Sequence, residues 1–134
     1  MLAPTRFVQQ TVSLPGSFQV ISAQDELFNH VDTNEYMWSG DGARHVRVEM
    51  TFDIPFAAPP AVTAALSGID SSQSENLRFN IRCEDITADG FTLIFDTWDN
   101  TRIARAGVAW TAQGIAPVRP RGSIAAKPKA PEGQ

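Results

Sequence analysis

Apolar residues occupy every second position through most of the middle of the chain, which is the period of a β-strand with one buried face. Five such runs span residues 46–52, 62–66, 77–83, 91–95 and 108–112. Two further runs near the N-terminus, 7–14 and 18–21, are expected to form a strand pair. No segment shows a 3.6-residue helical period of useful length. The pattern therefore predicts an all-β fold, an antiparallel β-sandwich.

Turn and loop signals separate these runs. A Pro-rich break at 55–60 and an Ala-Asp-Gly turn at 88–90 interrupt the strands, because a proline pair does not fit a central strand and glycine accepts positive φ at little cost. Residues 31–44 are expected to form a long ordered loop, and the Pro-rich, basic stretch from Ile115 onward is expected to be irregular. The predicted organisation is an N-terminal extension of strands and a loop at 1–37, a sandwich domain at 38–114 and a Pro-rich basic tail at 115–134.

Composition narrows the classes of function. The 134 residues are enough for one domain, and the formal net charge of -4 gives no support to nucleic-acid binding. No apolar run approaches the roughly 18 residues of a membrane span, and the N-terminus shows no signal peptide. The one cysteine, Cys83, excludes an internal disulfide, and with His30 and His45 it makes no metal cluster. We therefore expect a domain stabilised by packing, with no metal and no cofactor.

Strand parity makes Trp98 a candidate binding residue. With Phe91, Leu93 and Phe95 facing inward, the outward positions of the same strand are Thr92, Ile94, Asp96 and Trp98. Arg78 is expected on the outer face of its own strand. A sugar site needs an aromatic ring against the apolar face of the pyranose and polar groups for its hydroxyls, and these residues supply both. In the alternative, Trp98 fills a subunit interface or lies under the N-terminal loop.

Catalytic and metal-binding alternatives find less support. Asp96 and Asp99 could be imagined as a glycosidase pair, which needs two carboxylates roughly 5–9 Å apart across a cleft, but they look like ordinary strand-end and turn aspartates. Neither histidine lies in a nucleophile–base motif. The acidic stretch 70–75 lacks the ligand spacing and central glycine of a calcium loop. The sequence therefore predicts no enzymatic activity.

Several short motifs keep one order and spacing between about Trp38 and Gly114. They are the strand entry at 55–62, Gly68-Ile69-Asp70 with Ser74-Glu75-Asn76-Leu77-Arg78, Gly90-Phe91, Thr97-Trp98-x-Asn100-Thr101 and Val108-x-Trp110-x-Ala112. This set resembles the H-type lectin family, of the snail agglutinin and discoidin C-terminal domain type. The resemblance implies a six-stranded antiparallel β-sandwich that assembles as a homotrimer. It also implies sites for galactose-type sugars, often N-acetylgalactosamine, between neighbouring subunits.

The resemblance also assigns the residues of that site. It gives carbohydrate-binding roles to Arg78 and Trp98, and to Asp41, which the family donates across the subunit interface. Ser39 and Gly40 become second-tier candidates through their backbone groups. The chain departs from the family twice, with Asp99 where the snail proteins have histidine and Ala104 where they have tyrosine.

These two departures predict a change of specificity. Asp41 and Asp99 facing Arg78 are expected to accept bonds from a neutral galactose-like or amino-sugar ligand and to repel anionic sugars through uncompensated like charge. Ala104 is expected to leave room for a substituted sugar.

Two functions remain open at this point. The first is a multivalent carbohydrate-binding lectin that recognises glycans on a cell surface, where several weak sites gain avidity. The alternative is a structural or attachment protein of a phage-like particle, whose N-terminal extension and C-terminal tail contact other particle proteins. Both readings place the protein outside the cell or on the surface of a virion-like particle.

Overall fold

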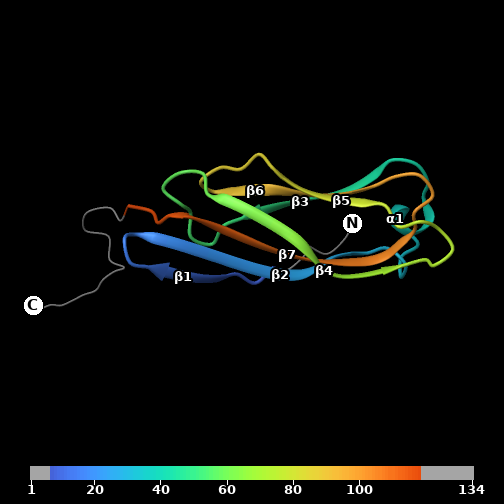
Figure 1. Ribbon diagram of the computed structural model, residues 1–134, viewed down its shortest axis with the longest axis horizontal. Coiled ribbons are helices and arrows are strands. Elements are labelled where there is room, and N and C mark those ends of the chain that lie inside the picture. The colour runs from blue at the N-terminus through green and yellow to red at the C-terminus, as the bar shows by residue number, and fades with distance from the viewer. Residues whose placement is uncertain (1–6, 119–134) are drawn as a thin grey trace, which may run out of the picture.

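The computed structural model describes residues 7–118 and shows an antiparallel sandwich of two sheets (Figure 1). The elements are β1 (Gln10–Leu14), β2 (Phe18–Asn29), α1 (Tyr36–Ser39), β3 (Arg44–Thr51), β4 (Ala61–Ser71), β5 (Phe79–Glu84), β6 (Gly90–Thr97) and β7 (Ile103–Ile115). One sheet has the order β1-β2-β7-β4 and the other β3-β6-β5. The predicted all-β sandwich is confirmed: β2 to β7 form its six strands, and β1 adds an edge strand.

The two ends of the sandwich differ in what closes them. Helix α1 and the loops at 40–43 and 98–102 lie at one end, which we call the helix end, and the turn between β1 and β2 lies at the other, the hairpin end (Figure 1). The chain enters β7 at the helix end, directly after the 98–102 loop, and leaves it at the hairpin end. Any residue on a strand can therefore be assigned to one end from its position along that strand.

The core follows the alternation that the sequence predicted. On β6 the inward positions are Phe91, Leu93 and Phe95, all of them buried. From β7, Trp110 is 1% exposed, and its ring meets Phe91 edge-on with the centroids 5.1 Å apart. Burying a large apolar side chain contributes roughly 1.5–3 kcal/mol, so these rows of alternate residues hold the two sheets together.

The N-terminal region departs from the prediction. The first strand begins at Gln10 and not at residue 7. The side chain of the preceding residue, Gln9, bonds across to the end of β3, donating to the Thr51 carbonyl and accepting from the Asp53 N–H. Strand β2 continues past the predicted end at Ile21 as far as Asn29 and pairs with β7 over most of its length. Much of the predicted N-terminal extension is thus part of the sandwich.

Ile94 shows that a residue on the outer face of the three-stranded sheet can still be covered within one chain. It lies on that face, as predicted, but it is fully buried at 0% exposure. Its cross-strand neighbours in register are Arg47 on β3 and Arg82 on β5, and long arginine stems cover apolar surface while their charged heads reach water. Ile94 is therefore not an apolar residue that needs a partner subunit to cover it.

The C-terminal region can be followed as far as Val118. Strand β7 extends through Ile115, so the predicted irregular tail begins inside a strand, and residues 119–134 lie outside the described part of the chain. Among residues 7–118, no helix is long and apolar enough to cross a membrane.

Candidate functional site

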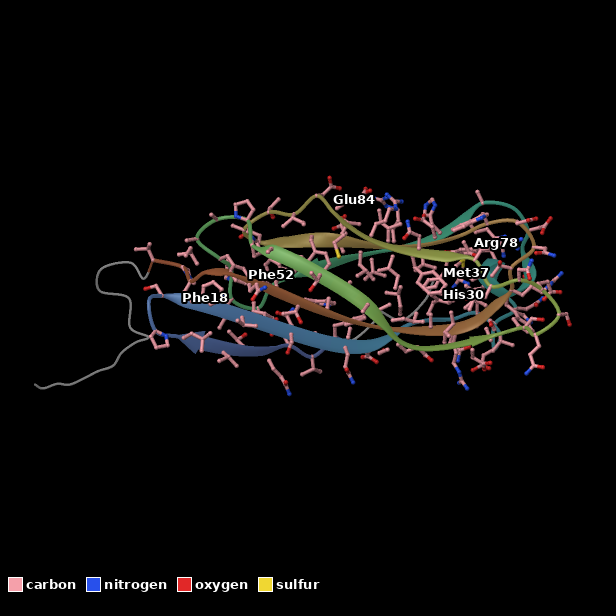
Figure 2. All side chains as sticks on the ribbon, in the orientation of Figure 1. Phe18, His30, Met37, Phe52, Arg78 and Glu84 are labelled. Atoms are coloured by element: carbon pink, nitrogen blue, oxygen red, sulfur yellow. The ribbon has the colours of Figure 1, made fainter. Side chains whose placement is uncertain are left out.

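The helix end brings together Arg78, Trp98 and Asp99. Trp98 follows β6 directly and is 43% exposed, as parity predicted for an outward position. The Arg78 guanidinium lies next to it in the fold, with Nη2 3.7 Å from Asp99 Oδ2 and Nη1 donating to Asn100 Oδ1 at 3.4 Å. Arg78 is labelled at this end in Figure 2. An exposed indole, a partly exposed guanidinium and an exposed carboxylate thus share one surface.

Two buried threonines hold the segment that carries Arg78 against the segment that carries Trp98. The Thr101 hydroxyl accepts the Arg78 N–H at 3.1 Å and donates to the Asn76 carbonyl at 2.6 Å. The Thr97 hydroxyl donates to the Arg78 carbonyl. The two threonines of the Thr-Trp-x-Asn-Thr motif therefore have a structural reason to be there: they fix Arg78 beside Trp98.

Arg44 joins the remaining loop to this surface, although no motif in the sequence had marked it as a site residue. It is only 9% exposed, and its guanidinium donates to backbone carbonyls instead of to a carboxylate. The acceptors are Tyr36 O at 3.1 Å, Met37 O at 3.4 Å, Gly42 O at 2.8 Å and Asp99 O at 3.1 Å. Arg44 therefore ties helix α1, the loop after it and the Trp98–Asp99 turn into one unit. The only signal in the sequence was a lone arginine at the boundary between a predicted loop and a strand.

Asp41 already lies near Asp99 within a single subunit. The N–H of Gly42 donates to the Asp99 carbonyl at 2.8 Å, which docks the Asp41 loop on the Trp98–Asp99 turn. Both residues of this contact have left-handed backbones, with φ of 75° at Gly42 and 62° at Asp99. Asp41 itself is exposed. A second subunit is therefore not needed to bring the Asp41 loop and Asp99 together.

The two second-tier candidates, Ser39 and Gly40, use their hydrogen-bond donors within and just before helix α1. The Ser39 hydroxyl donates to the carbonyls of Asn34 and Glu35, at 3.0 Å each. The Gly40 N–H closes the helix by donating to the Tyr36 carbonyl at 2.8 Å, and a Cβ at Gly40 would lie 2.5 Å from that same oxygen. These residues shape the loop, and their hydrogen-bond donors are not free for a ligand.

The electrostatics of the site differ from the expectation of uncompensated negative charge. Asp99 is close to Arg78, and Asp41 is the acidic neighbour of Arg44. Burial lowers the pKa of the Arg44 guanidinium, Asp41 raises it and Arg102 lowers it, but the ordinary value is so high that the group stays charged. Each carboxylate of the candidate site therefore has an arginine nearby.

The extra room expected at Ala104 stays a prediction, and a single subunit does not show it. Ala104 is buried, and its carbonyl accepts the N–H groups of His30 and Val31 at 2.8 and 3.1 Å. Within one subunit, Ala104 is therefore not part of the exposed surface that carries Trp98.

A groove of about 560 Å³ lies elsewhere, on the outer face of the four-stranded sheet. It runs beside Gly107, where both β2 and β4 change register against β7. Its lining residues are Gln24, Asp25, Glu26, Ser67, Gly68, Ile69, Asp70, Arg105, Ala106 and Gly107. None of these is aromatic, so the groove lacks the flat apolar ring that a pyranose packs against. The helix end therefore remains the stronger candidate.

The arrangement at the helix end is suited to binding. Among the described residues, no group of three or more histidine, cysteine, aspartate or glutamate side chains could hold a metal ion. The exposed indole offers a stacking surface, and Arg78, Asp99 and Asn100 offer donors and acceptors around it. These are the two kinds of contact that a sugar needs.

Comparison with known proteins agrees with this geometry. The model of the H-type lectin domain matches residues 47–113, which is half of the chain. The chain belongs to the H-type lectin family. This membership supports carbohydrate binding as the class of function, and the family and its fold are those of a binding protein. The H-type lectin match covers Arg78, Trp98 and Asp99, whereas Asp41 lies just before it.

Individual relatives of this H-type lectin chain extend the comparison. It is 43% identical over 88 residues to "ATP synthase subunits region ORF 7" of Fuscovulum blasticum, covering 66% of this chain and 76% of that protein. It is 32% identical over 66 residues to a discoidin-1 polypeptide of Dictyostelium discoideum, covering 48% of this chain and 26% of that one. Among solved structures, recombinant discoidin II of Dictyostelium discoideum aligns with a TM-score of 0.64 at 22% identity, covering 75% of this chain and 38% of discoidin II. The chain thus spans well under half of either discoidin, and the structural likeness establishes the shared fold.

Proposed function

We propose that this domain is a lectin whose sugar site is the helix-end surface formed by Trp98, Arg78, Asp99 and Asp41. One observation carries the proposal: a 43%-exposed indole stands beside an arginine–aspartate pair on a surface that buried residues hold in place. The pyranose would pack its apolar face on Trp98, while Arg78 donates to ring hydroxyls and the two aspartates accept from them. The domain would act by binding alone, with no catalysis.

The ligand that suits this surface is a neutral galactose-like or N-acetylgalactosamine-like sugar. Arg78 already has Asp99 at 3.7 Å, so an anionic sugar would find no unpaired cation there. A neutral sugar needs only the mixture of donors and acceptors that the pair presents. Sialylated ligands would have to displace Asp99 from Arg78, which costs part of any charge they gain.

Titration of the purified protein with galactosamine derivatives and with sialyllactose tests the site and its ligand class. Wild-type protein should bind a neutral sugar, and Trp98→Ala should reduce that binding at least about tenfold, the order expected for removing a central aromatic contact. Phe18→Ala is the matched control, since Phe18 lies at the hairpin end and should leave binding unchanged (Figure 2). Binding of sialyllactose alone would overturn the ligand class, and equal binding by Trp98→Ala would overturn the site.

We further propose that the domain assembles as a homotrimer. The proposal rests on the family resemblance and on the preference of such oligomers for closed cyclic symmetry. A single shallow sugar site binds weakly, and three sites on one rigid particle raise the avidity through effective concentration. Light scattering in the micromolar range should give three times the mass of one chain. A stable monomer there would contradict the proposal.

A second candidate function, attachment within a phage-like particle, is favoured by the apolar residues of the hairpin end. Val12, Leu14 and Ile115 are exposed there, on the outer face of the four-stranded sheet. They lie far from Trp98, so a second protein could bind them while the glycan site stays open. In either role the domain would work outside the cell or on the surface of a particle. Replacing Val12 and Leu14 by serine should leave glycan binding intact and abolish incorporation into such a particle.

A further inference from the structure

His30 is a buried histidine that lies between strand β2 and helix α1. It follows the last residue of β2 and is 1% exposed, with its ring 4.9 Å from that of Phe28 and 4.6 Å from that of Tyr36. Its backbone N–H donates to the Ala104 carbonyl of β7, and its carbonyl accepts the Glu35 N–H. Figure 2 shows it next to Met37, at the same end as Arg78. The glycan site proposed above makes no direct use of this residue.

The imidazole of His30 caps the N-terminus of α1. The N-cap residue of this helix, Glu35, makes no side-chain capping bond. Instead, the Met37 N–H donates to His30 Nδ1 at 3.1 Å. Because the first N–H groups of a helix have no partner inside the helix, an external acceptor stabilises the first turn. Here a histidine, seven residues earlier in the chain, is that acceptor.

The acceptor role fixes the protonation state of the ring. Nδ1 must be unprotonated to accept the Met37 N–H, so the neutral ring carries its hydrogen on Nε2. In the imidazolium both nitrogens are donors, and Nδ1–H would then point at Met37 N–H. Protonation therefore removes the cap and replaces it with two opposed donors.

The groups around the ring leave the imidazolium with little compensation. Among residues 7–118, Nε2 has no hydrogen-bond partner, and the nearest carboxylate oxygen, Glu35 Oε1, is 3.9 Å away. The Phe28 ring from β2 and the Tyr36 ring from α1 lie against the imidazole, and the Ala104 carbonyl of β7 is already used by the backbone N–H of His30. Burial lowers the pKa of His30 below its ordinary value of 6.5, and Glu35 only partly opposes this effect.

The other end of α1 leads directly into the glycan site. Its last carbonyls accept from two arginines, with Arg44 bonding Tyr36 and Met37 and Arg102 bonding Trp38 at 3.1 Å. Gly40 and Asp41 follow at once. The helix has only four residues, so losing its one N-terminal cap affects the whole element and the loop that continues from it.

We propose that His30 is a positioning residue for the glycan site: its neutral imidazole holds α1 and the Gly40–Asp41 loop in the binding geometry, and protonation of His30 releases them. This inference rests on the proposed function, since it concerns the loop that presents Asp41 to the sugar. The direction of the pH effect follows from linkage. A buried histidine that prefers the neutral form stabilises the docked loop at neutral pH, and that contribution is lost as the pH falls below 6.5.

The test compares glycan affinity at about pH 7.5 and about pH 5 in four proteins: wild type, His30→Asn, His45→Asn and Glu35→Gln. Wild-type affinity should fall about fivefold at the acidic pH, the change produced by losing one helix cap. His30→Asn places an amide oxygen where Nδ1 lies and does not titrate, so it should keep most of the neutral affinity and lose the pH dependence. His45 is the only other histidine of the chain and is exposed, so His45→Asn should behave as wild type. In Glu35→Gln the fall should be at least as large as in wild type, because the carboxylate that partly compensates the docked imidazolium is gone.

A second measurement does not depend on glycan binding. Hydrogen exchange of the Met37 amide should accelerate between neutral and acidic pH relative to amides of β6, and His30→Asn should abolish this relative change. If no glycan binds at any pH but the Met37 amide responds, the proposed function fails and the role of His30 stands. An equal pH dependence of affinity in wild type and His30→Asn, or a Met37 amide that does not respond, would overturn the inference.

Discussion

Different interactions stabilise the hairpin end and the helix end of the sandwich. At the hairpin end, aromatic rings from both sheets pack on one another, with Phe52 5.1 Å from Phe56 and Phe91 5.1 Å from Trp110 between ring centroids. At the helix end, aromatic rings also fill the core, but directional hydrogen bonds hold the loops. Those bonds come from Arg44, His30 and the two threonines of the Trp98 motif.

The difference separates stability from binding. Apolar packing has no direction and depends on buried area, so it stabilises the whole sandwich without fixing any loop. Hydrogen bonds to backbone carbonyls specify where a loop lies, at a modest net gain for each bond. We therefore expect substitutions at the hairpin end to change the free energy of unfolding, and substitutions at the helix end mainly to change glycan affinity.

The largest effect is expected for Trp110→Ala. This indole is almost fully buried against Phe52 and Phe91, so its loss leaves a large cavity and should lower the free energy of unfolding by about 3–5 kcal/mol. Chemical denaturation measures the change. A loss under about 1 kcal/mol would mean that the aromatic cluster is not the stabilising part of the core.

Arg44→Met should have an intermediate effect on stability and a large one on binding. Methionine keeps much of the apolar stem but removes a donor from four carbonyls, of which Tyr36 O and Asp99 O keep a backbone donor. The loss should cost about 2 kcal/mol and loosen the Asp41 loop against Asp99. Arg44→Lys keeps the charge without the planar fork of donors and should fall between wild type and methionine. Denaturation and glycan titration on the same samples would check both effects. Unchanged affinity in Arg44→Met would show that the loop is positioned by something else.

The smallest change in stability is expected for Trp98→Ala, although it is the variant that should lose glycan binding. Trp98 is exposed and stands outside the buried aromatic core, so its removal should alter the free energy of unfolding by no more than about 0.5 kcal/mol. If Trp98→Ala proved as destabilising as Trp110→Ala, the contrast between the ends would fail. Trp98 would then be a packing residue.

The strands were predictable wherever alternation is unbroken. The runs around Met50, Phe95 and Val108 lie on strands, and those three residues are buried. The same reasoning stopped β2 too early, at Ile21, because the next five residues, 22–26, are small or polar and show no apolar alternation. Beyond them, a register shift between Glu26 and Phe28 places the neighbouring residues Leu27 and Phe28 both in the core. A bulge breaks the two-residue period, and a period is all that the sequence pattern can detect.

The exposed residues of the candidate site could be predicted from the sequence, but the buried residues that hold them in place could not. Trp98 could be placed by parity, and Arg78 and Asp99 by the family resemblance; Arg78 lies just before β5 and not on that strand as expected, and the structure brings it together with Asp99 beside Trp98. Arg44 and His30 could not be predicted as site residues. Each bonds to backbone groups at sequence separations that follow no regular spacing, so no sequence motif indicates these bonds. The burial of Ile94 could not be predicted for a related reason: whether an outward residue is covered depends on the side chains of the neighbouring strands.

Strand β7 sets the distance between the helix end and the hairpin end of the domain. It starts at Ile103, next to the loops of the proposed glycan site, and ends at Ile115, which at roughly 3.3 Å per residue is about 40 Å away. A tether joined to the chain after Val118 therefore pulls on the end opposite Trp98. Protein captured on a sensor through such a tether would point its binding surface into solution, and a carrier fused there would leave sugar access unobstructed.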